Sequence, residues 1–149
     1  VKSVIREESA ALPIPLSGEA PVLDRPTLGV AGGFFHATTG YSLPFAVELA
    51  DLVAARRSFD AATLTPWLNE LAKEHWASQS FFRLLNRMLF RGAVPDERVR
   101  IFESFYKHDE ALIGRFYAGR LTSWDIVKVL ARGAPTVPGP RAMRAALGG

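Results

Sequence analysis

The chain has 149 residues, a length that suits one ordinary domain, and 48% of them are hydrophobic, which is ample for a packed core. It contains no cysteine, so disulfides, thiolate metal sites and a cysteine nucleophile are excluded, and we expect no metal site. The net charge of +3 is too small to indicate nucleic acid as a partner, and no uncharged stretch reaches the roughly 20 residues that span a bilayer.

Residues 1–43 carry the only pattern that favours β-structure. Residues 1–6 alternate apolar and polar side chains, and residues 28–35 form a short apolar run broken by glycines, as buried strands do. Residues 12–16 (LPIPL) contain two prolines, which predicts an edge strand or an extended segment. One or two strands are not stable alone, so this small β corner is expected to need partner strands.

Residues 44–149 are predicted to be helical almost to the end. Apolar residues recur at helical spacing over 45–53, and Asp60 is placed to cap a second helix. Pro66 is expected in the first turn of a third helix, whose apolar pattern continues to residue 91 and ends at Gly92. The fold class is therefore mostly α with a small β corner.

Further helices are predicted after Pro95 and over two shorter segments that end at Gly119 and Gly133. Thr122 or Ser123 is the expected cap of the last of these helices. Residues 134–149 contain several prolines and are expected to form a link and a frayed last turn.

Residues 32–42 (GGFFHATTGYS) carry the strongest chemical signal. A helix that begins near Ser42 after a glycine pair gathers backbone N–H groups, and its dipole favours negative charge at that point. His36, Thr38 and Thr39 add side chains that bind protons or donate hydrogen bonds. Two interpretations stay open, a site for an anionic group or a capped helix in which His36 is a satisfied turn residue.

Residues 78–91 (SQSFFRLLNRMLFR) predict a basic amphipathic helix with Arg83, Arg87 and Arg91 among large apolar side chains. Such a helix can lie in a membrane interface, or it can face the core and leave a basic edge in solvent.

Three segments resemble the C-terminal part of bacterial lycopene β-cyclases: residues 6–18 (REESAALPIPLSG), 36–54 (HATTGYSLPFAVELADLVA) and 81–130. That family shows an R-E-E-x-x-x-L-P-I-P-L-like segment and then G-x-x-H-P-T-T-G-Y-S-L-P at the start of a helix. Ala37 stands where the family usually has proline. Gly32-Gly33 stands where the wider flavoprotein superfamily has Gly-Asp, so the aspartate that binds ribose is missing.

The resemblance implies the C-terminal portion of an α/β, Rossmann-like FAD-binding fold, with residues 1–43 as the β-rich end of the FAD and substrate region and 44–149 as a helical region. No G-x-G-x-x-G fingerprint occurs in the 149 residues, so the dinucleotide-binding part is absent from them. It also implies closure of β-ionone rings on lycopene by carbocation chemistry without net redox change, with FAD reduced by NAD(P)H.

By the same resemblance, His36 either removes a proton or orients the flavin. The residues implied to bind the cofactor are Gly32, Gly33, Thr38, Thr39, Gly40, Tyr41 and Ser42. The family's acidic F-x-E-E/D motif, credited with proton donation, does not occur here. Glu7 and Glu8 are remote candidates for that role, and an exposed acidic pair beside Arg6 is the simpler interpretation.

The implied partners are lycopene or a related carotenoid and a peripheral contact with the inner membrane from the cytoplasm, without nucleic acid. The 149 residues alone are expected not to cyclise lycopene. Two alternatives remain: another flavoprotein that acts on a polyprenyl substrate, or a non-catalytic basic helical module that binds membranes or acidic partners.

Overall fold

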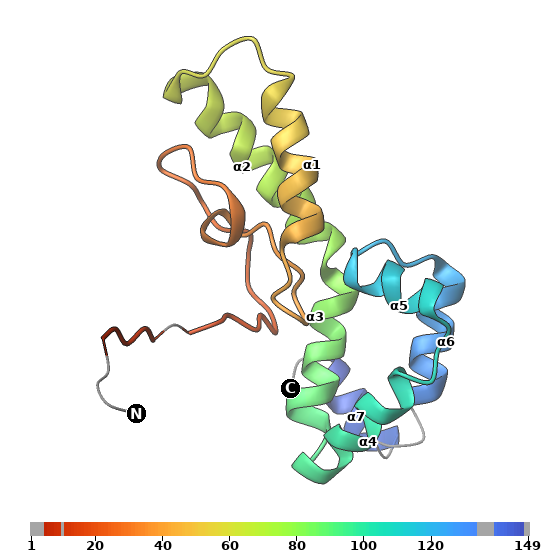
Figure 1. The fold of residues 1–149 in the computed structure, drawn as a ribbon. Coiled ribbons are helices and arrows are strands. Elements are labelled where there is room, and N and C mark those ends of the chain that lie inside the picture. The colour runs from red at the N-terminus through yellow and green to blue at the C-terminus, as the bar shows by residue number, and fades with distance from the viewer. Residues whose placement is uncertain (1–4, 10, 134–138, 148–149) are drawn as a thin grey trace.

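The computed structural model describes residues 5–9, 11–133 and 139–147, and these residues form helices and loops without a β-strand. The elements are a 3₁₀ turn η1 (Gly29–Gly32), helices α1 (Leu43–Ala54), α2 (Ala61–Ser78) and α3 (Ser80–Arg87), a π-helical turn η2 (Met88–Gly92), and helices α4 (Pro95–Phe105), α5 (Glu110–Tyr117), α6 (Ser123–Gly133) and α7 (Gly139–Ala146). In Figure 1, α3 continues the direction of α2, with α1 packed at the α2 end and α4 to α7 gathered at the other.

The prediction of a β corner is wrong for the described residues. Residues 29–32 form η1, and residues 12–16 have no regular structure; of the predicted first strand, residues 1–4 lie outside the described residues. Gly29 (φ 63°) and Gly33 (φ 84°) turn the chain in the left-handed region, and the N–H groups of Gly33 and Phe34 donate to carbonyls inside the turn. Because a strand needs a neighbour for its backbone hydrogen bonds, a turn that satisfies itself replaces it here.

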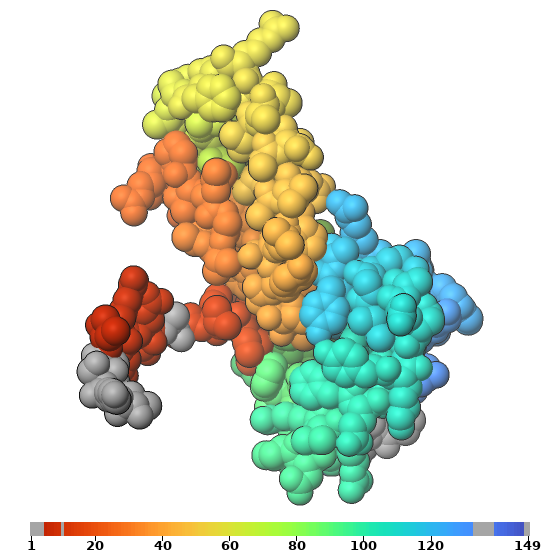
Figure 2. Space-filling model, viewed as in Figure 1, coloured from red at the N-terminus to blue at the C-terminus, as the bar shows by residue number. Residues whose placement is uncertain are grey.

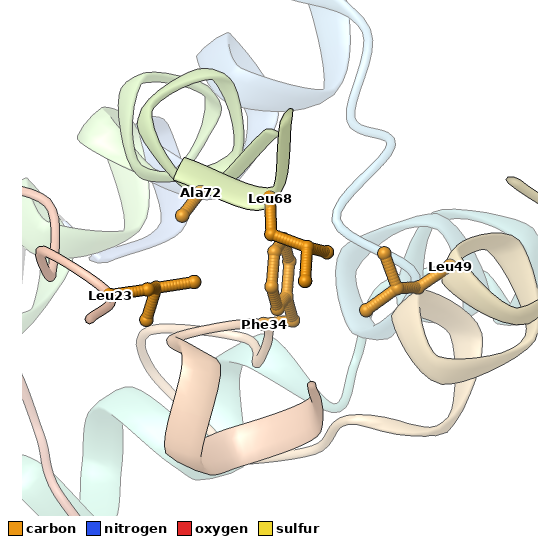
Figure 3. Packing of buried hydrophobic residues seen from close by; sticks show 5 residues of the cluster. All are labelled: Leu23, Phe34, Leu49, Leu68 and Ala72. Carbon is orange, nitrogen blue, oxygen red and sulfur yellow. The ribbon is translucent and has the colours of Figure 1, made fainter. Parts of the chain in front are cut away.

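One hydrophobic cluster joins the N-terminal loops to α1 and α2. Figure 3 shows Leu23 and Phe34 from the loops meeting Leu49 of α1 and Leu68 and Ala72 of α2, and all five side chains are buried. Two hydrogen bonds hold the loop in place, because the Asn69 side chain accepts from Leu23 N (2.8 Å) and donates to Leu23 O (3.0 Å).

A second cluster lies between the His36 turn, α3 and α5. Its buried members are Ala37, Phe82 and Phe116, with the half-buried Leu85 and Phe105 packed against them. The aromatic rings of Phe82 and Phe116 meet edge to face at 5.3 Å between centroids. This cluster positions the candidate site described below.

The predicted helices are largely confirmed, with two corrections. Asp60 caps α2, as predicted, by accepting from Thr63 N (2.9 Å). Pro66 lies inside α2 and does not begin a third helix, and the long pattern over 66–91 divides at Gln79 into α2 and α3. Gly92 ends the helical run as predicted, although its last turn is π-helical, with Ala93 N donating to Met88 O (3.0 Å).

The caps of the later helices come from side chains at their starts. Thr122 caps α6 as predicted, because its hydroxyl accepts from Asp125 N (3.1 Å). Asp125 in turn accepts from Thr122 N (3.0 Å) and from the Arg115 guanidinium (2.7 and 2.8 Å), which holds the pKa of its carboxyl well below the usual range. Asp109, which the sequence analysis did not single out, caps α5 through Leu112 N (2.8 Å). Helix α7 replaces the expected frayed turn.

Gly119→Ala is expected to lower the free energy of unfolding by about 1–3 kcal/mol, since alanine is strained at positive φ and the added carbon overpacks the site. Gly119 has φ 69°, and a Cβ there would lie 2.8 Å from Phe45 Cζ. Urea unfolding measures the change. Gly114→Ala is the matched control, because a Cβ on this α5 glycine meets none of the described atoms within 4 Å, and it should stabilise the helix by about 0.5–1 kcal/mol. Equal effects of the two changes would contradict the prediction.

Candidate functional site

The side chain of His36 is fully buried between α3 and α5. Its ring lies 4.1 Å from that of Phe82 and 5.2 Å from that of Phe116, centroid to centroid. Nε2 lies 2.8 Å from the Phe116 carbonyl oxygen, which can only accept, so the proton is on Nε2. Nδ1 then accepts from the backbone N–H groups of Thr38 (3.2 Å) and Thr39 (3.3 Å).

Burial lowers the pKa of His36 to about 4, against the opposing effect of the Phe116 carbonyl. The imidazole is therefore neutral near pH 7, and each of its nitrogens already has a partner. These contacts argue against proton removal by His36, and they show that His36 orients the backbone of Thr38 and Thr39. The assignment of His36 to the site stays a prediction.

The turn that follows His36 closes on itself. Gly40 N donates to His36 O (2.8 Å), His36 N donates to Tyr41 O (2.8 Å), and Tyr41 N donates to the Thr39 hydroxyl (3.2 Å). Together with the bonds from Thr38 and Thr39 to the imidazole, these contacts use the backbone N–H groups of residues 38–41. The predicted cradle of free N–H groups is thus occupied by the chain itself at these positions.

Gly32 and Gly33 let neighbouring parts of the chain approach closely. A Cβ on Gly32 would lie 2.5 Å from Thr27 O, and a Cβ on Gly33 would lie 2.6 Å from Pro21 Cγ. Internal packing therefore accounts for this glycine pair. Around Gly40 (φ 71°), by contrast, the described residues place no atom within 4 Å of a Cβ, which leaves open space beside it.

The N-terminus of α1 keeps the electrostatic character that the sequence predicted. Across the described residues, no side chain caps the helix at Ser42, and its first turn contains no acidic residue. The partial positive charge of the helix end lies next to the open side of Gly40 and the partly exposed Tyr41. Because the N–H groups of Gly40 and Tyr41 are already bonded, the part of the predicted cofactor site left for an anionic group is the open space beside Gly40 and Tyr41 and the uncapped helix end at Ser42.

Gln79, between α2 and α3, and Asn86 of α3 support the turn, and neither was predicted as a site residue. Ala37 N donates to Gln79 Oε1 (3.1 Å), and Asn86 Nδ2 donates to Ala37 O (2.8 Å) and Pro15 O (2.9 Å). Both side chains are almost completely buried. Their position as amides within the apolar run 78–91 is the signal that points to them, since buried amides need fixed partners.

Two arginines of the predicted basic helix, Arg83 and Arg87, are turned toward the chain. Arg83 is buried, lies over the Trp76 ring at 4.1 Å and donates to Trp76 O, and Arg87 donates to Leu16 O (2.7 Å). These two contacts favour the core-facing interpretation for Arg83 and Arg87. Among the described residues, no helix is both long enough and apolar enough to cross a membrane.

Glu7 and Glu8 are exposed, and the N-terminal segment that carries them projects away from the helices in Figure 1. Arg6 forms an ion pair with Glu8. The structure thus agrees with the simpler interpretation of an exposed acidic pair and does not bring either carboxylate to the candidate site.

An apolar cavity of about 330 Å³ lies directly beside the turn. Thr38 and Thr39 form one edge, and the other lining residues come from α3, η2, α4, α5 and α6: Leu85, Met88, Leu89, Ile101, Phe102, Phe105, Tyr106, Phe116, Tyr117, Val129, Leu130 and Arg132. The hydroxyls of Tyr106 and Tyr117 lie 2.7 Å apart, and this hydrogen bond with burial raises the pKa of Tyr117 to about 12. The cavity is therefore neutral apart from Arg132.

A helical protein with a largely apolar cavity of this size can accommodate a hydrocarbon group. A family model described as "Lycopene cyclase protein" matches residues 1–144, and the chain belongs to that family. Comparison with solved structures gave no significant match.

The curated relatives carry the same name. The chain is 45% identical to a lycopene beta-cyclase from Pantoea ananas over 149 residues, 97% of this chain and 39% of the relative. It is 45% identical to one from Pseudescherichia vulneris (95% and 38% covered) and 38% identical to one from Paracoccus sp. (strain N81106 / MBIC 01143; 94% and 38% covered). The chain thus spans about two fifths of the length of the curated relatives it matches.

Proposed function

We propose that the protein takes part in the β-cyclisation of lycopene and that the cavity beside the His36 turn holds one end of the carotenoid. Family membership supports the reaction, and the cavity is the observation that supports the site. In this reaction a proton adds to the terminal alkene, the resulting tertiary cation closes the ring, and a proton leaves the new ring. One proton enters and one leaves, so the product is an isomer.

The walls of the cavity suit such a cation. The rings of Phe105, Phe116 and Tyr117 present π-electrons, which attract positive charge where water is excluded. A volume of about 330 Å³ suits an end group better than a whole carotenoid. Because lycopene dissolves in membranes, we place the protein at the cytoplasmic side of the inner membrane as a peripheral protein.

Reduced FAD, with NAD(P)H as its electron source, is the cofactor we propose. Gly40, Tyr41 and Ser42 at the N-terminus of α1 would hold the flavin. The space beside Gly32 and Gly33 is occupied by Thr27 and Pro21. Bound there, the anionic reduced flavin would supply negative charge near the cavity. His36 fixes Thr38 and Thr39, which line the cavity and precede this helix end in the chain.

Met88→Trp tests the cavity, since the larger ring fills it from η2. The assay replaces the matching region of the Pantoea ananas relative by this chain, expresses the chimera in lycopene-accumulating cells and separates the carotenoids by chromatography. We expect cyclised product from the chimera and its loss with Met88→Trp. Met143→Trp on α7 is the matched control, because Met143 is 68% exposed and lies outside the cavity.

The outcomes separate the alternatives. Full activity of a folded Met88→Trp chimera would contradict the placement of the substrate. A folded chimera that makes no cyclised product would contradict the reaction itself, and a product with fewer double bonds would instead indicate a reductase.

A further inference from the structure

Helix α1 buries one of its faces against α2. Leu49 is 5% exposed in the cluster with Leu68, and Phe45 and Val53 pack against the same cluster. Glu48 and Asp51 form a narrow polar strip on another side of the helix. At about 100° per residue these groups account for a little more than half of the helix circumference.

The remaining arc, here termed the outer face of α1, is apolar and exposed: it consists of Leu43, Ala46, Val47, Ala50 and Ala54. Leu43 is 59% exposed and Val47 is 56% exposed. Figure 2 shows the gold atoms of α1 along the front of the molecule with nothing over them. An apolar arc about 100° wide is typical of a face that packs on a core, and α1 has one more such face than its own neighbours cover.

A groove of about 610 Å³ runs along one edge of this face. Leu43 and Val47 belong to both the face and the groove. The groove also passes over the polar strip of Glu48 and Asp51, and its other lining residues are Pro44, Leu52, Ala118 and Arg120. A flat apolar face beside a groove can receive another element with projecting side chains, because ridges pack into grooves.

The charges on α1 argue for a protein over a lipid surface as the occupant. The helix carries Glu48 and Asp51 and contains no lysine or arginine, so an anionic lipid surface would be repelled. Arg120 also lines the groove, but its positive charge is offset by Glu48, whose Oε2 lies 3.5 Å from Arg120 Nη2.

We propose that the outer face of α1 docks against the portion of a lycopene cyclase polypeptide that this chain does not span. Each curated relative holds about three fifths of its length outside the matched region, so in these proteins a partner for the face belongs to the same molecule. This inference rests on family membership alone and does not depend on the reaction proposed above.

Single cysteines test the docking, because the chain contains none of its own. Val47→Cys places a thiol on the outer face, and Val99→Cys on α4 is the matched control, since Val99 is 59% exposed and Val47 is 56% exposed. In the 149-residue chain, both thiols should react with iodoacetamide at similar rates. In the chimera with the Pantoea ananas relative, modification at position 47 should slow by about tenfold or more, because a covered site reacts only when it opens. Modification at position 99 should not change, and peptide masses assign the labelled thiol.

Equal labelling at position 47 in the chain and the chimera would overturn the proposal. Protection at position 47 that grows with the concentration of the 149-residue chain would assign the face to a second copy. Protection that appears only with phosphatidylglycerol vesicles would assign it to a membrane.

If the chimera does not fold, the two parts are co-expressed as separate chains. The 149-residue chain should then retain its partner on an affinity column. Val47→Asp should lose the partner and Val99→Asp should keep it, and retention by Val47→Asp would again overturn the proposal. Neither readout uses lycopene, so failure of docking is distinguishable from failure of the proposed reaction.

Discussion

Replacement of His36 by alanine is expected to lower the free energy of unfolding by about 3–5 kcal/mol, among the largest effects of a single change in this chain. The imidazole is fully buried, and its loss leaves the Phe116 carbonyl and the N–H groups of Thr38 and Thr39 without their partner. It also opens a cavity between the Phe82 and Phe116 rings. Urea unfolding of the 149-residue chain measures the change.

Two conservative variants separate the contributions of Nδ1 and Nε2 of His36 to the free energy of unfolding. The amide oxygen of His36→Asn can replace Nδ1 as the acceptor for Thr38 and Thr39, because Asn readily bonds the backbone two residues on. The amide nitrogen of His36→Gln can replace Nε2 as the donor to Phe116. Each variant should recover part of the stability lost in His36→Ala. His108→Ala is the control, since Nε2 of His108 has no hydrogen-bond partner among the described residues. If His36→Ala costs no more than this control, the role assigned to His36 is wrong.

Acidification is expected to remove a similar amount of stability. The pKa of His36 is about 4 in the folded chain and 6.5 when unperturbed, because burial disfavours the charged ring. Above pH 6.5 both states are neutral and the full stability is present. Below it the unfolded chain binds a proton that the folded chain refuses, so stability falls until the pH reaches about 4. Integration over pH 7 to 4 gives a loss of about 3 kcal/mol from this group.

The test compares the free energy of unfolding at pH 7 and pH 4.5 in the wild-type chain and in His36→Gln. His75 and His108 also have lowered pKa values, mainly through burial, and they add to the wild-type slope in the same direction. The free energy of unfolding of His36→Gln should therefore still fall on acidification, but by less than that of the wild-type chain, and the difference is the contribution of His36. An identical slope in both proteins would show that His36 titrates as an exposed histidine.

The helical part of the fold could be predicted because its signals are local. Asp60, Thr122 and Gly92 mark helix ends through contacts within a few residues, and those assignments are confirmed. Pro66 was misplaced because proline is tolerated both at a helix start and, at a cost, within a helix. The strand at 28–35 was wrong because β-structure depends on a neighbouring strand, which local sequence does not contain.

The sequence indicated the segment around His36 as a candidate site but did not reveal its contacts. The segment around His36 was identified by its residue types, yet its two decisive contacts come from far along the chain. Phe116 lies 80 residues away, and Gln79 reaches Ala37 across 42 residues. No spacing rule predicts such contacts, so the burial of His36 and the use of the N–H groups of residues 38–41 emerged only from the structure.

The π-helical turn η2 has a consequence for how the cavity can be altered. A π-turn holds one residue more than an α-turn, and here it closes the helical run that α3 begins. Removing one residue from Met88–Gly92 would move the point at which the chain leaves the helix by about 100° around the helix axis. The shape of the cavity thus depends on the length of the backbone as well as on side-chain size. Deletions in this turn offer a route to cavity shapes that point substitutions cannot reach.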